Sequence, residues 1–89
     1  MLTQDIEIVN KLGLHARAAA KLVNLATAFE ADVEIEKDGK RVNGKSIMSV
    51  MMLAANQGSM LTLHIDGGDE NEAMAQVVEL INARFGEGE

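Results

Sequence analysis

The sequence predicts an α+β fold: an open-faced two-layer β-sandwich in which a four-stranded, mostly antiparallel sheet carries three helices on one face. Two observations predict it. Short stretches that alternate apolar and polar residues are interleaved with longer stretches of helical periodicity, in the order βαββαβα. Each predicted strand also has only one apolar face. We therefore expect the helices to share that face and the other face to be open to water.

Each expected element follows from a local pattern. The strands alternate apolar with charged or polar residues, as Ile6 and Ile8 do with Asp5 and Glu7. The helices carry one apolar stripe. In chain order the expected elements are a strand over 3–8, a helix over 16–28, strands over 32–37 and 40–43, a short helix over 47–53, a strand over 60–66 and a helix from about 69 to 85.

Turn and cap residues set the boundaries of these elements. Asp38-Gly39 predicts a tight hairpin, because glycine accepts the positive φ of such a turn. Ser46 is a suitable N-cap for the short helix. Asp69 to Glu72 matches a variant of the capping box at the start of the last helix, which Gly86 would end.

Composition limits the kind of protein. The 89 residues are enough for a single domain, 1–89, with an aliphatic core. Without cysteine there is no disulfide framework or thiolate metal site, and we expect no metal and no cofactor. A net charge of −6 argues against nucleic acid as a partner. No apolar stretch of about 18–20 residues and no signal-peptide pattern is present, so we expect a cytoplasmic protein that is not inserted in a membrane.

Residues 39–46, GKRVNGKS, match the phosphate-binding pattern G-x-x-x-x-G-K-[ST] letter for letter. That pattern binds nucleotides only between a strand and a helix, where a loop of backbone N–H groups cradles the phosphates. Here Gly39 belongs to the hairpin and residues 40–43 are a predicted strand. We therefore interpret the stretch as a hairpin strand followed by a capped helix. A nucleotide-binding enzyme is the alternative, and binding of ATP by the isolated chain would support it.

The segment GLHARAAAKL combines a reactive side chain with an anion site. Gly13 allows a tight turn before a helix whose first N–H groups, those of Ala16 and Ala18 among them, favour an anion. Arg17 adds a planar fork of donors that suits phosphate oxygens. The same helix end disfavours an imidazolium, so we expect His15 to be neutral and nucleophilic. These features predict a phosphoryl acceptor, for which the sequence assigns no general base.

GLHARAAAKL, followed further along by GKSIMSVMMLAANQG, resembles the HPr family of phosphocarriers of the phosphoenolpyruvate-dependent phosphotransferase system. The resemblance covers essentially the whole chain and implies the sandwich fold described above. It implies that His15 takes a phosphoryl group on Nδ1 from phospho-enzyme I and passes it to an EIIA-type protein, with Arg17 stabilising that group. The chain would then be a carrier and not an enzyme. One departure is Ala18, where the family usually has proline.

The resemblance also implies a regulatory site and a docking surface. Ser46 corresponds to a serine that an HPr kinase/phosphorylase modifies in some bacteria, whereas its N-cap role needs no such kinase. The short helix is apolar around most of its surface, and methionine packs adaptably against different partners. The expected docking residues are Ala20, Lys21, Asn24, Ile47, Met48 and Met51.

Two points stay open in the sequence: the branch of the phosphotransferase system to which the chain belongs, and its oligomeric state. The nitrogen-related branch of the system resembles this chain about as well as the sugar branch does. A member of that branch would be a regulatory module that binds partners according to its phosphorylation state. We expect a carrier that exchanges partners to be a monomer when free.

Overall fold

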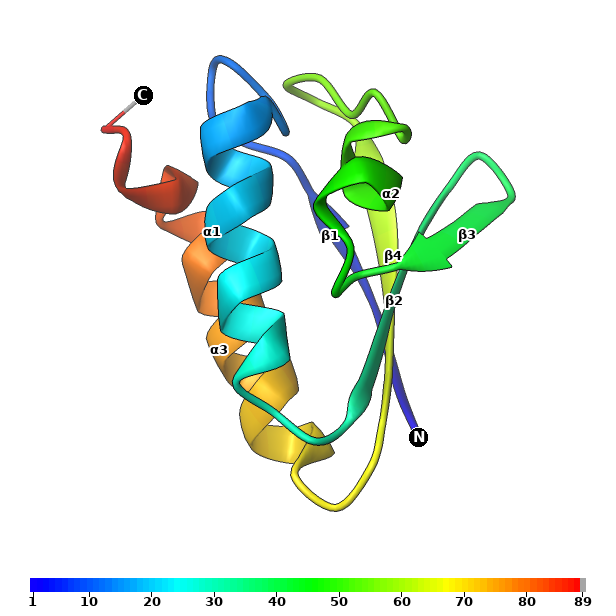
Figure 1. Cartoon of the computed structure of the whole chain (residues 1–89). Helices are drawn as coiled ribbons and strands as arrows, with labels where there is room; N and C mark the ends of the chain where they lie inside the picture. The colour runs from blue at the N-terminus through cyan, green and yellow to red at the C-terminus, as the bar shows by residue number, and fades with distance from the viewer. Residues whose placement is uncertain (89) are drawn as a thin grey trace.

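The computed structural model describes residues 1–88, and its four strands form one sheet in the spatial order β1-β4-β2-β3. Every neighbouring pair is antiparallel. β4 therefore lies inside the sheet, paired with β1 on one side and with β2 on the other (Figure 1). The strands are β1 Leu2–Glu7, β2 Asp32–Lys37, β3 Lys40–Asn43 and β4 Met60–Asp66.

The helices cover one face of this sheet. Figure 1 shows α1 and α3 side by side along that face, with the shorter α2 beside the upper part of α1. This arrangement confirms the predicted open-faced sandwich and its order, βαββαβα, and the sheet is antiparallel throughout. None of the helices within residues 1–88 has the length and apolar character needed to cross a membrane. The helical elements are α1 Ala16–Thr27, α2 Ile47–Met51, α3 Glu70–Asn82 and a single 3₁₀ turn, η1 Arg84–Gly86.

An aliphatic core fills the space between the two layers. β2 and β4 contribute every second residue to it, as the alternation predicts: Val33 and Ile35 from β2, and Leu61, Leu63 and Ile65 from β4. β1 buries Ile6, and Val42 of β3 is partly buried. The sequence pattern places Phe29 in the apolar stripe of the first helix and Leu80 in that of the last, but both side chains are only partly buried. Phe29 also lies beyond the end of α1. The fully buried side chains of largest volume include Phe85, Ile8, Leu22, Ile35, Leu61, Leu63, Ile65 and Ile81.

Two predictions about the last helix are wrong. Asp69 makes no side-chain cap bond to α3; its carboxylate instead accepts hydrogen bonds from the backbone N–H groups of Glu30 and Ala31, both at 2.9 Å. The helix also ends at Asn82 and not near Phe85. Arg84 and Phe85 both have positive φ, 58° and 54°, and the chain turns there so that the Phe85 side chain enters the core.

The segment that matches the phosphate-binding pattern is a hairpin and a cap. Gly39, with φ of 82°, lies in the turn that joins β2 to β3. The backbone of β3 pairs with β2 and so forms no cradle. The hydroxyl oxygen of Ser46 accepts a hydrogen bond from Ser49 N at 3.3 Å and caps α2. The predicted hairpin strand and capped helix are confirmed.

Candidate functional site

His15 occupies the N-cap position of α1, at the end of a tight loop. Gly13 turns this loop with φ of 69°, and its N–H donates to Asn10 O at 3.2 Å. A Cβ atom on Gly13 would lie 2.5 Å from the carbonyl oxygen of Ala55, so the close approach requires glycine. Leu14 N donates to that same oxygen at 2.8 Å. The backbone of residues 10–14 is thus fixed just before the histidine.

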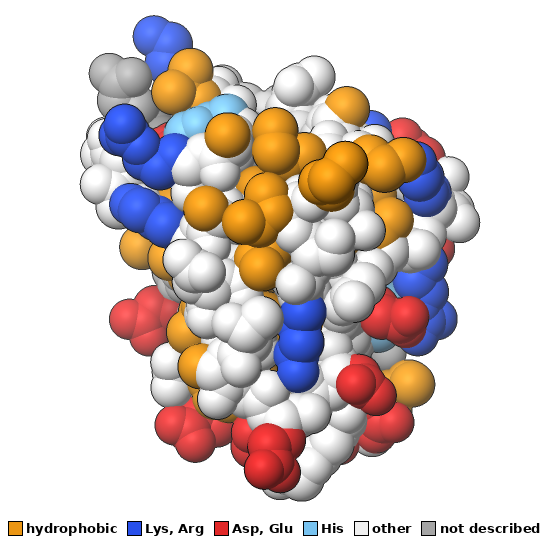
Figure 2. Space-filling model, viewed as in Figure 1, with side chains coloured by type: hydrophobic (Ala, Val, Ile, Leu, Met, Phe, Trp, Pro, Cys, Tyr) orange, Lys and Arg blue, Asp and Glu red, His pale blue; other side chains and the backbone are white. Residues whose placement is uncertain are grey.

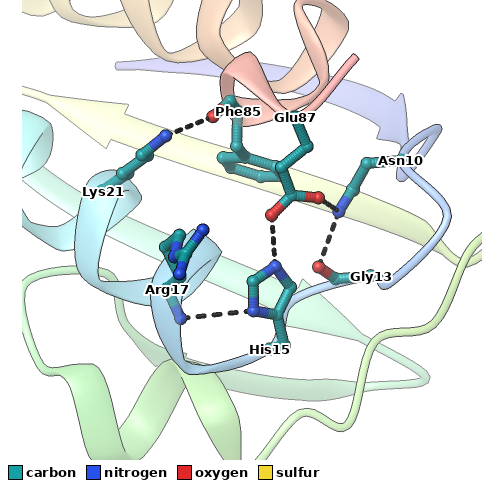
Figure 3. Close-up of polar contacts among 7 residues, drawn as sticks. All are labelled: Asn10, Gly13, His15, Arg17, Lys21, Phe85 and Glu87. Carbon is teal, nitrogen blue, oxygen red and sulfur yellow. Dashed lines mark hydrogen bonds and ion pairs between the residues drawn. The ribbon is translucent and has the colours of Figure 1, made fainter. Parts of the chain in front are cut away.

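The two ring nitrogens of His15 have different partners (Figure 3). The backbone N–H of Arg17 donates to Nδ1 at 3.3 Å. Nε2 faces a carboxylate oxygen of Glu87. An ionised carboxylate only accepts hydrogen bonds, so Nε2 carries the hydrogen of the neutral ring and Nδ1 keeps its lone pair. These partners make Nδ1 the nucleophilic nitrogen, at the positive end of α1.

The carboxylate of Glu87 is held from a second side by a buried amide. Nδ2 of Asn10, a fully buried residue, donates to Gly13 O at 2.8 Å and to Glu87 Oε1 at 2.9 Å. Burial raises the pKa of the Glu87 carboxyl. Hydrogen bonds from Asn10 and His15, with the charge of Lys21, outweigh that effect, and the pKa lies below its ordinary value. Glu87 is therefore ionised at neutral pH.

The segment that carries Glu87 is anchored on α1 and in the core. The side chain of Phe85 is fully buried. The Nζ of Lys21 donates to the carbonyl oxygen of Phe85 at 2.6 Å, on the face of α1 that also bears Arg17. Gly86 is the only residue between this anchor and Glu87. The fold thus places the Glu87 carboxylate beside the start of α1.

A cavity of about 670 Å³ opens beside His15. Three of its lining side chains are basic, although the protein as a whole has a net charge of −6. With the free N–H groups of a helix N-terminus, such a site favours a small anionic group. The lining residues are Lys11, Leu12, His15, Ala16, Arg17, Lys21, Gly86 and Glu87.

The structure brings together some of the residues predicted from sequence and separates others. His15, Ala16, Arg17 and Lys21 share the cavity. The Ala18 side chain is fully buried, but its backbone N–H lies in the first turn of α1. It comes just before the N–H of Ala19, which donates a hydrogen bond to His15 O. Ser46, the N-cap of α2, does not line the cavity.

Sequence reasoning missed two residues of this site, Asn10 and Glu87. Both contact the loop or ring of His15, yet neither belongs to a recognisable motif. Glu87 lies 72 residues from His15 in sequence, and its position depends on the turn after α3. A lone acidic residue between two glycines was the only available signal.

An apolar surface adjoins the site (Figure 2). Orange side chains gather over α2 and the neighbouring side of α1, next to the pale blue histidine and the basic side chains. Val50 and Leu53 are buried in the core. We call the exposed residues of α2 and its C-cap the α2 patch; they are Ile47, Met48, Met51 and Met52.

Comparisons with known proteins agree on one family. Residues 2–83 match the family model described as "PTS HPr component phosphorylation site". The phosphocarrier protein HPr of Neisseria meningitidis serogroup A is 56% identical over 89 residues, which cover all of both chains. A crystal structure of HPr-C-His from Thermoanaerobacter tengcongensis superimposes with a TM-score of 0.95 at 48% identity, over 98% of each chain.

A further solved structure bears on the oligomeric state. The crystal structure of an HPr dimer, also from Thermoanaerobacter tengcongensis, is 50% identical to this chain and has a TM-score of 0.79. It covers 92% of this chain, which covers 94% of that one. The expectation of a free monomer therefore stays a prediction.

Proposed function

This chain belongs to the HPr family of phosphocarrier proteins of the phosphotransferase system, and we propose that His15 carries its phosphoryl group. The observation that supports the proposal is that Nδ1 carries no hydrogen and keeps its lone pair, because Nε2 faces Glu87. This lone pair lies at the N-terminus of α1, beside Arg17 and a basic cavity. Nucleophile, anion-binding N–H groups and guanidinium thus meet at one point.

Transfer requires positioning and charge compensation more than acid–base chemistry. In the proposal, phospho-enzyme I presents its phosphoryl group to Nδ1, and the first N–H groups of α1 (those of Ala16 and Ala18 among them) and the guanidinium of Arg17 neutralise its oxygens. An EIIA-type protein then takes the group from Nδ1. The chain is a protein substrate in both steps, in the cytoplasm, and no small molecule is turned over.

Both partners must reach the same nitrogen, so we propose one docking surface for both. It joins the α2 patch to the exposed side of α1. The exposed methionines of α2 adapt to differently shaped partners, and Lys21 supplies charge at the rim. The proposed docking residues are Ala20, Lys21, Asn24, Ile47, Met48 and Met51.

Ser46 offers a means of regulating that docking. Its hydroxyl caps α2, immediately before Ile47 and Met48. Phosphorylation by an HPr kinase/phosphorylase would add about two negative charges beside the apolar patch. A phosphate is compatible with the helix N-terminus, so its effect would fall on partner binding and not on folding.

Intact mass spectrometry tests the central claim. The protein is incubated with enzyme I, magnesium and phosphoenolpyruvate, and then treated with mild acid. We expect one added phosphate that acid removes, no addition to His15→Ala, and normal addition to the control His64→Ala, since His64 lies on β4. A phosphate that resists acid, or that His15→Ala still accepts, would refute the assignment. Supplying EIIA-type acceptors of the sugar and nitrogen-related branches separately then tests which branch the carrier serves.

A further inference from the structure

We propose that Glu87 is a positioning residue for phosphoryl transfer: its carboxylate fixes the His15 ring with hydrogen on Nε2, which leaves Nδ1 to receive the phosphoryl group. The inference rests on the proposed function, since it names a further residue of the same site. It concerns a side chain that lies far from His15 in sequence and touches the ring on the side away from Arg17 N.

The hydrogen-bond pattern requires an acceptor at both oxygens of residue 87. Asn10 Nδ2 already donates to Gly13 O at 2.8 Å, so the amide of Asn10 is held with its donor toward the site. The same Nδ2 donates to Glu87 Oε1, and Oε2 faces His15 Nε2. Only a carboxylate offers an acceptor to both partners. A glutamine would place an NH₂ group against one of them.

Burial strengthens this pattern. Asn10 is fully buried, and the side chains of His15 and Glu87 are only 28% and 15% exposed. Hydrogen bonds and charges at such positions are screened less by water than those at the surface. Because Phe85 and Lys21 anchor the segment, the carboxylate is already in place before any partner arrives.

The carboxylate also suits the charge that transfer creates. The Nδ1 lone pair forms the N–P bond while the bond from phosphorus to the donor breaks and its electron pair leaves with the donor. The ring keeps its hydrogen on Nε2 and so gains positive charge, which faces Glu87. When the group moves on, the N–P electron pair returns to Nδ1 and the charge disappears. A carboxylate that orients and stabilises an imidazolium is the role that aspartate has in serine protease triads.

The first test reads the tautomer without any phosphoryl transfer. ¹⁵N NMR of His15 in the unphosphorylated protein is recorded as a function of pH, and the tautomer is read from the alkaline plateau of the shifts. We expect the wild type to show hydrogen on Nε2 and Glu87→Gln to shift a measurable fraction to Nδ1. Glu79→Gln removes the same charge from an exposed position on α3 and should match the wild type. An unchanged tautomer in Glu87→Gln would overturn the inference.

The second test is kinetic. We expect Glu87→Gln to lower kcat for phosphoryl uptake from phospho-enzyme I by about 10- to 100-fold, the range observed when a metal-bound histidine loses its hydrogen-bond partner. The KM for the donor should stay unchanged, because the α2 patch is intact. Equal kcat values for Glu87→Gln and Glu79→Gln would contradict the role.

The two proposals fail in different ways. If wild-type protein takes no phosphate on His15, the proposed function fails, whatever the tautomer. If wild type is phosphorylated there and Glu87→Gln changes neither tautomer nor kcat, only the role of Glu87 fails.

Discussion

Replacing Gly13 by alanine tests whether backbone packing fixes the loop that carries His15. Two strains would act on the new side chain. The residue has φ of 69°, and its Cβ would lie 2.5 Å from Ala55 O and 2.9 Å from Asn56 Cα. Both neighbours are backbone atoms, so neither can rotate away, and the loop itself must move.

Gly39 provides a matched control that separates the two strains. Its φ is 82°, close to that of Gly13, but a Cβ there would meet nothing within 4 Å. Gly39→Ala should therefore lower the free energy of unfolding by the left-handed penalty alone, about 1–2 kcal/mol. Gly13→Ala carries that penalty and a steric one of about 1–3 kcal/mol. The expected total of about 2–5 kcal/mol lies within or below the stability of about 4–13 kcal/mol that a domain of this size has.

Urea denaturation followed by circular dichroism measures the stability difference, and the ¹⁵N shifts of His15 report on the loop. We expect Gly13→Ala to be less stable than Gly39→Ala and to shift the His15 signals. Gly39→Ala should leave those signals and phosphoryl uptake unchanged. Equal losses of stability in the two variants would refute the reasoning, since they would mean that contact with residues 55 and 56 adds nothing.

Three further predictions follow from other contacts. The hydrogen bond from Glu30 N–H, with that from Ala31, lowers the pKa of Asp69 below its ordinary value. The carboxylate therefore stabilises the fold above about pH 4. This stabilisation is lost as the pH falls through the lower pKa that Asp69 has in the folded state. Asp69→Asn should thus be less stable than wild type in urea at pH 7, with the gap closing in acid; a gap independent of pH would contradict this. Ser46→Ala should lose about 1 kcal/mol of unfolding free energy and Ser46→Gly only a few tenths, and equal losses would argue against the cap. Phe85→Ala should lose about 3–5 kcal/mol, measured in the same way, and a loss under about 1 kcal/mol would show that Phe85 does not anchor the last segment.

Local patterns predict the sheet because the alternation of apolar and polar residues within a strand shows which of its faces is buried. Residues 60–66 alternate in sequence, and their burial alternates in the structure. The site at the start of α1 could be predicted for the same reason, since Gly13, His15 and Arg17 lie within five residues of one another. Where burial and local backbone preference agree, sequence is sufficient.

The errors arose where a distant contact overrode a local preference. Asp69 has the spacing of a capping residue, but the unpaired N–H groups after α1 use its carboxylate instead. Ala83 and Arg84 favour continuation of a helix, whereas burial of Phe85 demands a turn with positive φ. Glu87 depends on that turn, so no local reading of the sequence could have placed it beside His15.

Because His15 is the N-cap of α1, a phosphoryl group on its ring would change how the start of the helix is capped. Nδ1 has one lone pair, and in the free protein the N–H of Arg17 uses it. A phosphoryl group bonded to Nδ1 would take that pair and leave the N–H without its acceptor. The phosphoryl oxygens, more strongly charged and only a bond farther out, would then become the cap. Loading would replace a nitrogen cap by an oxyanion cap, and the first turn of the helix would differ in stability between the empty and the charged carrier.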